Sequence, residues 1–105
     1  MKKILHINFK FKVTRSELEK AFLQVAPRFS PSGDVKGLLW KIWCVNEAEK
    51  SAAGIYLFKD EASVETFLKG DIVAGIKSNP ALSNMEAKVF DILLELTKIS
   101  RGPVD

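Results

Sequence analysis

The sequence predicts an α+β domain, in which antiparallel strands form one sheet and helices pack on it. Three observations predict this class. Residues 3–11 alternate between apolar and polar side chains, as a half-buried strand does. A helix start signal follows at Thr14. The densest apolar stretch, residues 37–58, then contains two strand-like runs joined by a polar turn, which is the pattern of a β-hairpin.

The first strand and the helix after it each have a distinct apolar face. One strand face carries Leu5, Ile7, Phe9 and Phe11, and the other carries Ile4, His6, Asn8 and Lys10. Thr14 and Glu17 have the spacing of a capping box, in which each side chain accepts a hydrogen bond from the other residue's backbone amide. The apolar residues that follow at helical spacing are Leu18, Phe22, Val25 and Phe29. Pro27 cannot donate a helical hydrogen bond, so we expect the helix to kink or end near Ala26.

The hairpin is apolar on both faces, whereas a strand with one solvated face should alternate between apolar and polar residues. Its first strand carries Leu38, Trp40, Ile42 and Cys44 on one face and Leu39, Lys41, Trp43 and Val45 on the other. Its second strand carries Ala53, Ile55 and Leu57 opposite to Gly54, Tyr56 and Phe58. Only Lys41 interrupts the apolar pattern of the two strands. Both faces of the predicted sheet must therefore be shielded from water by other packed elements.

The second half of the chain predicts another helix and a last strand. Asp60 is a natural N-cap for a helix that ends at Gly70. Residues 71–76 are expected to add one short helical turn, and residues 82–84 to form a loop. Residues 85–93 are rich in Val, Phe and Ile, which predicts the last strand.

The predicted order of strand, helix, strand, strand, helix, strand is the βαββαβ plan of ferredoxin-like folds. This plan places two helices on one face of a four-stranded antiparallel sheet. We expect residues 1–105 to form one such domain, with a tail from about residue 94 that forms a helical turn and is then flexible. The opposite sheet face is too apolar to remain in water, so we predict a homodimer that closes sheet against sheet.

The composition is that of a soluble globular domain. Hydrophobic residues make up 47% and charged residues 28% of the sequence, and the net charge is only +3. The basic residues are spread along the chain, so no nucleic-acid partner is expected. No apolar run reaches membrane-spanning length, and the N-terminus does not have the pattern of a signal peptide. We therefore expect a cytoplasmic protein that does not bind membranes.

Metal and nucleotide sites find little support in the sequence. Cys44 is the only cysteine and His6 the only histidine, so no internal disulfide or zinc-type cluster is expected, although a haem held by His6 alone remains open. In the usual strand order Cys44 lies on an edge strand, away from His6, which argues against a nucleophile pair. The glycines form no phosphate-loop or dinucleotide pattern, so we expect neither NAD nor ATP as a cofactor.

Several segments resemble the YdhR-like monooxygenase family. They are Gly37-Leu-Leu-Trp-Lys-Ile-Trp43, Ala53-Gly-Ile-Tyr-Leu-Phe58, the acid-capped helix that ends in Phe67-Leu68, and Ala87-Lys-Val-Phe-Asp91. The resemblance runs over residues 4–91 and implies a dimeric α+β barrel, in which two ferredoxin-like protomers pack their sheets together. It also implies similarity to small enzymes that oxidise aromatic polyketides with dioxygen and with no bound flavin or metal. It brings no catalytic motif, so the candidate residues follow from chemistry alone.

A cofactor-independent monooxygenase needs a base or a proton donor beside an enclosed aromatic or quinone-like substrate, whose anion reacts with dioxygen. We take His6 as the candidate base and Tyr56 as the candidate proton donor. The candidate substrate-binding residues are Asn8, Trp40, Lys41, Trp43 and Phe58. Strand alternation places Trp40 on the face opposite to Lys41 and Trp43, so these residues cannot all line one pocket.

Each candidate also has a structural interpretation. His6, Lys41 and the two tryptophans would then serve packing, a dimer interface or ion pairing. The chain would in that case be a non-catalytic dimeric protein that binds a small molecule. An RNA-recognition module is the third alternative, because residues 5–9 and 54–58 echo its two strand motifs. His6 stands where that module needs a stacking aromatic residue, which weighs against it.

Overall fold

The computed structural model describes residues 1–105. Its elements, in chain order, are β1 (Lys3–Phe11), α1 (Arg15–Val25), the 3-10 helix η1 (Ala26–Phe29), β2 (Leu38–Asn46), β3 (Ser51–Phe58), α2 (Glu61–Leu68), α3 (Asp71–Ser78), β4 (Leu82–Asp91) and α4 (Leu94–Ile99). No helix among them is long and apolar enough to cross a membrane.

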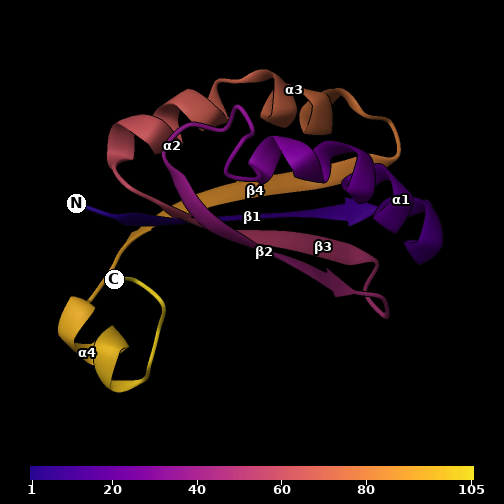
Figure 1. The fold of residues 1–105 in the computed structure, drawn as a ribbon. Helices are drawn as coiled ribbons and strands as arrows, with labels where there is room; N and C mark the ends of the chain where they lie inside the picture. Colours follow the sequence, from indigo (N-terminus) through magenta and orange to yellow (C-terminus); the bar gives the residue numbers. More distant parts are fainter.

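The four strands form one antiparallel sheet in the order β2-β3-β1-β4. Figure 1 shows α1, α2 and α3 on one side of this sheet and α4 on the opposite side. We call these two sides of the sheet the helix face and the open face. This topology confirms the predicted ferredoxin-like α+β class, with α3 as a third helix on the helix face.

The register of the strands determines which side chains share a face. Leu5 on β1 pairs with Tyr56 on β3, and Tyr56 pairs in turn with Lys41 on β2. Gly54 on β3 likewise pairs with Trp43 on β2. Directly paired residues point to the same side of a sheet, so Lys41, Trp43 and Tyr56 all face the helices, as the buried Leu5 does.

A β-bulge interrupts β2 at its start. The pairing of β2 with β3 shifts between Leu38 and Trp40, which makes Leu39 an extra residue. Leu38 therefore pairs with Phe58 and packs against the core, whereas Trp40 pairs with Leu57 and faces the open side. The prediction that Leu38 and Trp40 share a face is wrong, because one inserted residue reverses the alternation of a strand.

The helix boundaries follow from local hydrogen bonding. The Thr14 hydroxyl accepts a hydrogen bond from the backbone N–H of Glu17 at 3.1 Å, and the Glu17 carboxylate accepts one from the N–H of Thr14 at 3.3 Å. The predicted capping box is therefore present. α1 ends at Val25 and passes into the 3-10 helix that contains Pro27, which has no N–H for the α-helical ladder. Asp60 caps α2 by accepting from a first-turn amide at 2.9 Å.

Two predicted boundaries are wrong. The short turn expected for residues 71–76 is the eight-residue helix α3, and Gly70 is its N-cap rather than the end of α2. Residues 82–84 begin β4, which ends at Asp91, rather than forming a loop. Asn84 has a positive φ of 56°, and the pairing of β4 with β1 shifts around it. The turn-like composition of this segment therefore marks a β-bulge inside a strand.

The hydrophobic core lies between the sheet and the helices α1, α2 and α3. Leu5 and Ile7 of β1 and Phe58 of β3 are at most 1% exposed. Val64 of α2 and Val73 of α3 pack against them and are each 1% exposed. Burial of such side chains supplies most of the stability of a small domain, so this layer holds the helices on the sheet.

The C-terminal segment packs on the open face. Nε1 of Trp40 donates a hydrogen bond to the carbonyl of Pro103 at 2.8 Å, and Nζ of Lys2 donates one to the carbonyl of Val104 at 2.8 Å. Val104 itself is only 5% exposed. The flexibility expected for this tail stays a prediction, and these contacts oppose it.

The rest of the open face exposes apolar side chains. Ile42 on β2 and Phe90 on β4 are each 49% exposed. Leu96 and Ile99 of α4 are 63% and 80% exposed. Apolar side chains gathered in this way usually mark an interaction surface.

Candidate functional site

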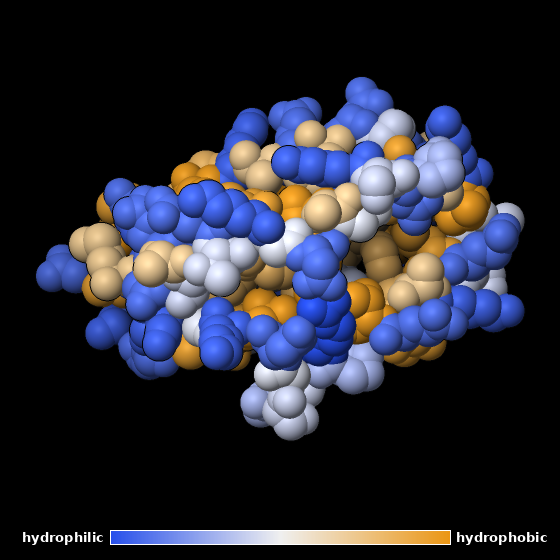
Figure 2. All heavy atoms as spheres, turned by 90° about the horizontal axis from the view of Figure 1, so that it is seen from above, coloured by the Kyte–Doolittle hydropathy of each residue, from blue (hydrophilic) through white to orange (hydrophobic).

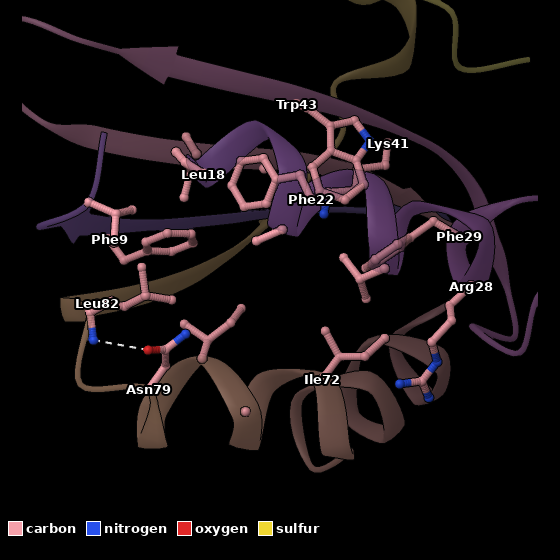
Figure 3. A pocket seen from close by; sticks show the side chains of 18 of the residues that line it. Phe9, Leu18, Phe22, Arg28, Phe29, Lys41, Trp43, Ile72, Asn79 and Leu82 are labelled. Atoms are coloured by element: carbon pink, nitrogen blue, oxygen red, sulfur yellow. Dashed lines mark hydrogen bonds between the residues drawn. The ribbon is translucent and has the colours of Figure 1, made fainter. Parts of the chain in front are cut away.

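A cavity lies between the helix face of the sheet and the helices α1 and α3. Its volume is about 490 Å³, within the range of about 300–1,000 Å³ that is typical of small-molecule sites. Fourteen of the 20 residues that line it are hydrophobic, so it can hold an apolar ligand away from water. Figure 2 shows the helix side, where apolar side chains are visible in a hollow between polar surface regions. Figure 3 shows the cavity itself from close by.

Aromatic side chains from four elements form one wall of the cavity. The ring centroid of Trp43 on β2 lies 5.0 Å from that of Phe22 on α1 and 5.3 Å from that of Phe29 on η1. Tyr56 on β3 continues this wall, with its ring centroid 6.1 Å from that of Phe29. Ile72 of α3 lies across the cavity from Trp43 (Figure 3). A flat aromatic ligand would therefore meet ring faces on one side and aliphatic side chains on the other.

Lys41 places an amine within this aromatic wall. Its Nζ lies 3.3 Å from the centroid of the Trp43 ring and 3.9 Å from that of the Phe29 ring. Burial lowers the pKa of Lys41 to about 7, while the faces of the aromatic rings favour its charged form. None of the five ion pairs in the structure involves this lysine. The amine can therefore gain or lose a proton near neutral pH without breaking an ion pair.

Tyr56 places a hydroxyl group in the same cavity. The residue is 2% exposed, and burial raises the pKa of its phenol, so the hydroxyl stays protonated. Gly54 makes room for the ring, because a Cβ atom at that position would lie 2.8 Å from the tyrosine oxygen. No fully buried side-chain nitrogen or oxygen lacks a hydrogen-bond partner, and neither Tyr56 Oη nor Lys41 Nζ makes a hydrogen bond. Both atoms therefore reach the open space of the cavity.

Two other charged residues line the cavity, near opposite ends of α1. Glu17 belongs to the capping box, and hydrogen bonds from Thr14 hold the pKa of its carboxyl below the usual value. Arg28 donates two hydrogen bonds of 2.8–2.9 Å to Asp34 and two of 2.7–2.9 Å to Asp71. The charges of Glu17 and Arg28 are thus already engaged, in contrast to the lysine amine.

The structure brings together three of the seven candidate residues from the sequence. Lys41, Trp43 and Tyr56 line the cavity. Phe58 shares their sheet face but is fully buried and does not line the cavity. It stacks on Tyr56, with ring centroids 6.0 Å apart and ring planes 22° apart, and so supports the cavity wall from within the core.

The other three candidates, His6, Asn8 and Trp40, lie on the open face. His6 pairs with Ile55 of β3, and Trp40 holds the C-terminal segment as described above. The sheet separates this face from the cavity, and His6 does not line the cavity. Cys44 lies on the edge strand β2, two strands away from the histidine strand β1, as the sequence predicts. Nowhere in the structure do three His, Cys, Asp or Glu side chains lie close enough together to hold a metal ion.

The sequence interpretation missed the part of the site that the helices contribute. The spacing of Phe22 and Phe29 places them on the apolar face of the predicted helix and does not by itself indicate a ligand site. Ile72 and Ile76 of α3 recur at the i, i+4 spacing of one helix face and also line the cavity. This spacing is the signal that could have found them, but apolar periodicity cannot distinguish a cavity wall from a filled core.

Known structures with the same fold include oxygenases and proteins without an assigned role. SnoaB, a cofactor-independent oxygenase from Streptomyces nogalater, is 17% identical with a TM-score of 0.66, covering 87% of this chain and 92% of that one. NE2512 of Nitrosomonas europaea, a protein of unknown function, is 20% identical with a TM-score of 0.71 (88% and 89% coverage). The heme-degrader MhuD of Mycobacterium tuberculosis is 18% identical with a TM-score of 0.63 (86% and 95% coverage). At these identities the likeness shows the fold alone.

The comparison at the level of protein families extends over most of the sequence. No curated protein matches the chain significantly. The family described as "Putative mono-oxygenase ydhR" matches residues 4–103, which include the sheet, all helices and most of the C-terminal segment. The chain therefore belongs to the ydhR mono-oxygenase family.

Proposed function

We propose that this protein is a cofactor-independent monooxygenase that oxidises an aromatic or quinone-like small molecule in the cavity between the sheet and the helices α1 and α3. One observation carries the proposal. An apolar cavity with an aromatic wall contains two polar groups, the amine of Lys41 and the hydroxyl of Tyr56, that have no hydrogen-bond or ion-pair partner in the protein. Membership of the ydhR family and the likeness to SnoaB support an oxygenase.

The chemistry needs no redox group in the protein. An electron-rich hydroxyanthrone loses a proton from its ring methylene, and the resulting anion donates electrons to dioxygen to form a carbon–oxygen bond. Loss of water from the hydroperoxide product leaves a carbonyl group. One dioxygen thus oxidises the methylene carbon by four electrons, with one oxygen atom ending in the carbonyl and the other in water. The protein has to orient the ring, exclude bulk water and stabilise the anion.

The structure suggests different roles for the two polar groups. Because the pKa of the Tyr56 phenol is raised, its hydroxyl can donate a hydrogen bond to a developing oxyanion without losing its proton. Lys41, with a pKa lowered to about 7, can accept the substrate proton or stabilise the anion once it forms. Trp43 and Phe29 present ring faces on which the substrate can lie. We therefore assign the chemistry to Lys41 and Tyr56 and not to His6.

Oxygen uptake with 1,8-dihydroxyanthrone as the substrate tests the function. The wild-type protein should accelerate uptake above the rate seen with heat-denatured protein. Tyr56→Phe should lower kcat by about 100-fold, the typical effect of removing one oxyanion donor. His6→Gln should leave the rate unchanged, because the sheet separates this residue from the cavity.

Two outcomes would contradict the proposed reaction site or the proposed reaction. Loss of uptake in His6→Gln, with full uptake in Tyr56→Phe, would move the chemistry to the open face. Tight binding of the anthrone without any acceleration of uptake would instead support the second candidate, a non-catalytic binding protein, which the apolar cavity also favours.

The proposal includes a homodimer that forms through the open face. Exposed apolar side chains on that face, such as Ile42 and Phe90, support it, because sheet-to-sheet closure would remove them from water. Light scattering after size exclusion should give twice the chain mass of 11.7 kDa. Ile42→Glu should shift the mass to that of one chain, whereas Leu23→Glu, at an exposed position on α1, should not. A wild-type monomer with salt-sensitive RNA binding would favour the RNA-recognition module instead.

A further inference from the structure

The cavity contains one basic group whose charge no carboxylate of the protein balances. Of its charged lining residues, Arg28 binds two carboxylates and Glu17 is held in the capping box. Lys41 has no carboxylate within ion-pair distance and contacts only ring faces through its amine. An ammonium group away from water is costly unless it is paired, and ring faces offset only part of this cost. The cavity is therefore complementary to a ligand that carries the missing negative charge.

The shape of the cavity indicates what kind of anion would fit. Phosphate-type anions are often bound by forked arginines, and the arginine that lines this cavity, Arg28, is already engaged by Asp34 and Asp71. The surroundings of the amine are instead the faces of Phe29, Trp43 and Tyr56. These groups stack on flat unsaturated rings. A single amine among such aromatic rings fits one oxyanion attached to an aromatic ring system.

We propose that the cavity selects aromatic oxyanions, with the anionic oxygen held by Nζ of Lys41 and the ring system lying against Trp43 and Phe29. This inference rests on the proposed function, because it names the substrate class of the same cavity. A phenol or enol that is more acidic than the ammonium form of Lys41 transfers its O–H proton to the neutral amine when it enters in its neutral form. A ligand that enters already ionised meets an amine that has taken its proton from water. Both routes end in the same ammonium–oxyanion pair.

The remaining charges set the orientation of the ligand. Glu17 lies in the first turn of α1, whereas Arg28 lies in η1, beyond the other end of that helix. The carboxylate of Glu17 repels an anion, so the oxyanion points away from it and toward the strand β2 that carries Lys41. The uncharged end of the ring system then lies toward the start of α1.

Binding of 2-naphthoate and 2-naphthamide, followed by tryptophan fluorescence, tests the inference without any turnover. The two probes share size and rings, but only the first is an anion. Wild-type protein at about pH 6, where the amine of Lys41 is protonated, should prefer 2-naphthoate by about 10- to 100-fold, the range expected for one charged hydrogen bond. Lys41→Met keeps the apolar stem and should abolish this preference while leaving the 2-naphthamide affinity within about threefold. Lys20→Met, which removes an exposed lysine from α1, should retain the preference.

The pH dependence of the wild-type protein gives a second readout that needs no variant. 2-Naphthoate stays ionised from about pH 6 to 9, so a loss of its affinity with rising pH reports deprotonation of the cavity amine. The titratable groups that face Lys41 do not change charge in this range. Burial raises the pKa of Tyr56, Thr14 lowers that of Glu17, and Asp71 and Asp34 raise that of Arg28.

The results separate this inference from the proposed reaction. Equal affinity of wild-type protein for both probes, or a preference that survives in Lys41→Met, would overturn the inference even if oxygen uptake with the anthrone succeeds. Failure of both probes to bind would overturn it as well. A charge preference that depends on Lys41, found in a protein that never consumes oxygen, would support the inference while the proposed oxygenase reaction fails.

Discussion

The stability of the protein should depend on pH through Lys41, with a sign opposite to that of an ion-paired lysine. Burial lowers the pKa of this lysine to about 7 in the folded state, against 10.5 for the ordinary side chain. Between these two values the unfolded chain binds more protons than the folded one at this position, so the free energy of unfolding rises with pH. The cost of burying the charge is fully present below about pH 7 and disappears above about pH 10.5.

The magnitude follows from the size of this window. A difference of 10.5 − 7, or about 3.5 pKa units, at about 1.4 kcal/mol per unit sets an upper value of about 5 kcal/mol. The facing rings of Trp43 and Phe29 stabilise the charged amine by about 0.5–2 kcal/mol, which acts in the opposite direction. We therefore expect Lys41 to add about 3–4.5 kcal/mol to the free energy of unfolding as the pH rises across the window.

Urea unfolding of wild-type protein and Lys41→Met, at one protein concentration and at several pH values from about 6.5 to 9.5, measures this term. Other groups titrate in both proteins, so the difference between them isolates Lys41. The wild type should gain stability relative to Lys41→Met as the pH rises, whereas its difference from Lys20→Met should stay flat, because Lys20 is exposed. A wild-type minus Lys41→Met difference that does not change with pH would refute a desolvated amine, and with it the geometry of the cavity.

Three further predictions concern the support of the cavity and the tail. Gly54→Ala should lower the free energy of unfolding by about 1–3 kcal/mol, because the new Cβ would lie within 3.0 Å of the Tyr56 ring. In a double-mutant cycle measured by urea unfolding, Gly54→Ala should cost much less in the Tyr56→Leu background than in the wild type. Additive effects of the two substitutions on the free energy of unfolding would contradict a contact between position 54 and the Tyr56 ring. Leu5→Ala should destabilise the domain by about 2–5 kcal/mol, since this core side chain is 0% exposed, and a thermal midpoint unchanged from wild type would be inconsistent with the register of β1. Removal of residues 102–105 should expose Trp40 to water and shift its fluorescence to longer wavelength, because the hydrogen bond to the tail carbonyl is lost; an unshifted spectrum would show that the tail does not pack there.

Most of the fold could be predicted from the sequence because the elements are locally encoded. The alternation along β1 and the capping box at Thr14 depend only on neighbouring residues, as does the end of α1 before Pro27. The errors fall where a contact distant in sequence overrides the local pattern. Asn84 sits in a segment of loop-forming residues, yet pairing with β1 draws that segment into β4 as a bulge.

The candidate site could be predicted only in part. The register of β2 with β3 was needed to add Tyr56 to the face that carries Lys41 and Trp43. Strand alternation alone placed only Lys41 and Trp43 together, because the period of two is a property of any extended chain. It could not say which face the helices would cover. His6 on the open face was therefore as good a candidate as Tyr56 on the helix face.

The sequence by itself determined the βαββαβ order, the apolar hairpin with Lys41 as the only lysine of its two strands, and the membership of a mono-oxygenase family. Only the tertiary structure decided that the space between the sheet and α1 and α3 stays open as a cavity. The helical spacing of Phe22, Phe29 and Ile72 is also typical of residues that fill a core. Whether these side chains fill the space depends on the distance between the sheet and the helices packed on it. That separation arises from the packing of the whole chain, so no local pattern records it.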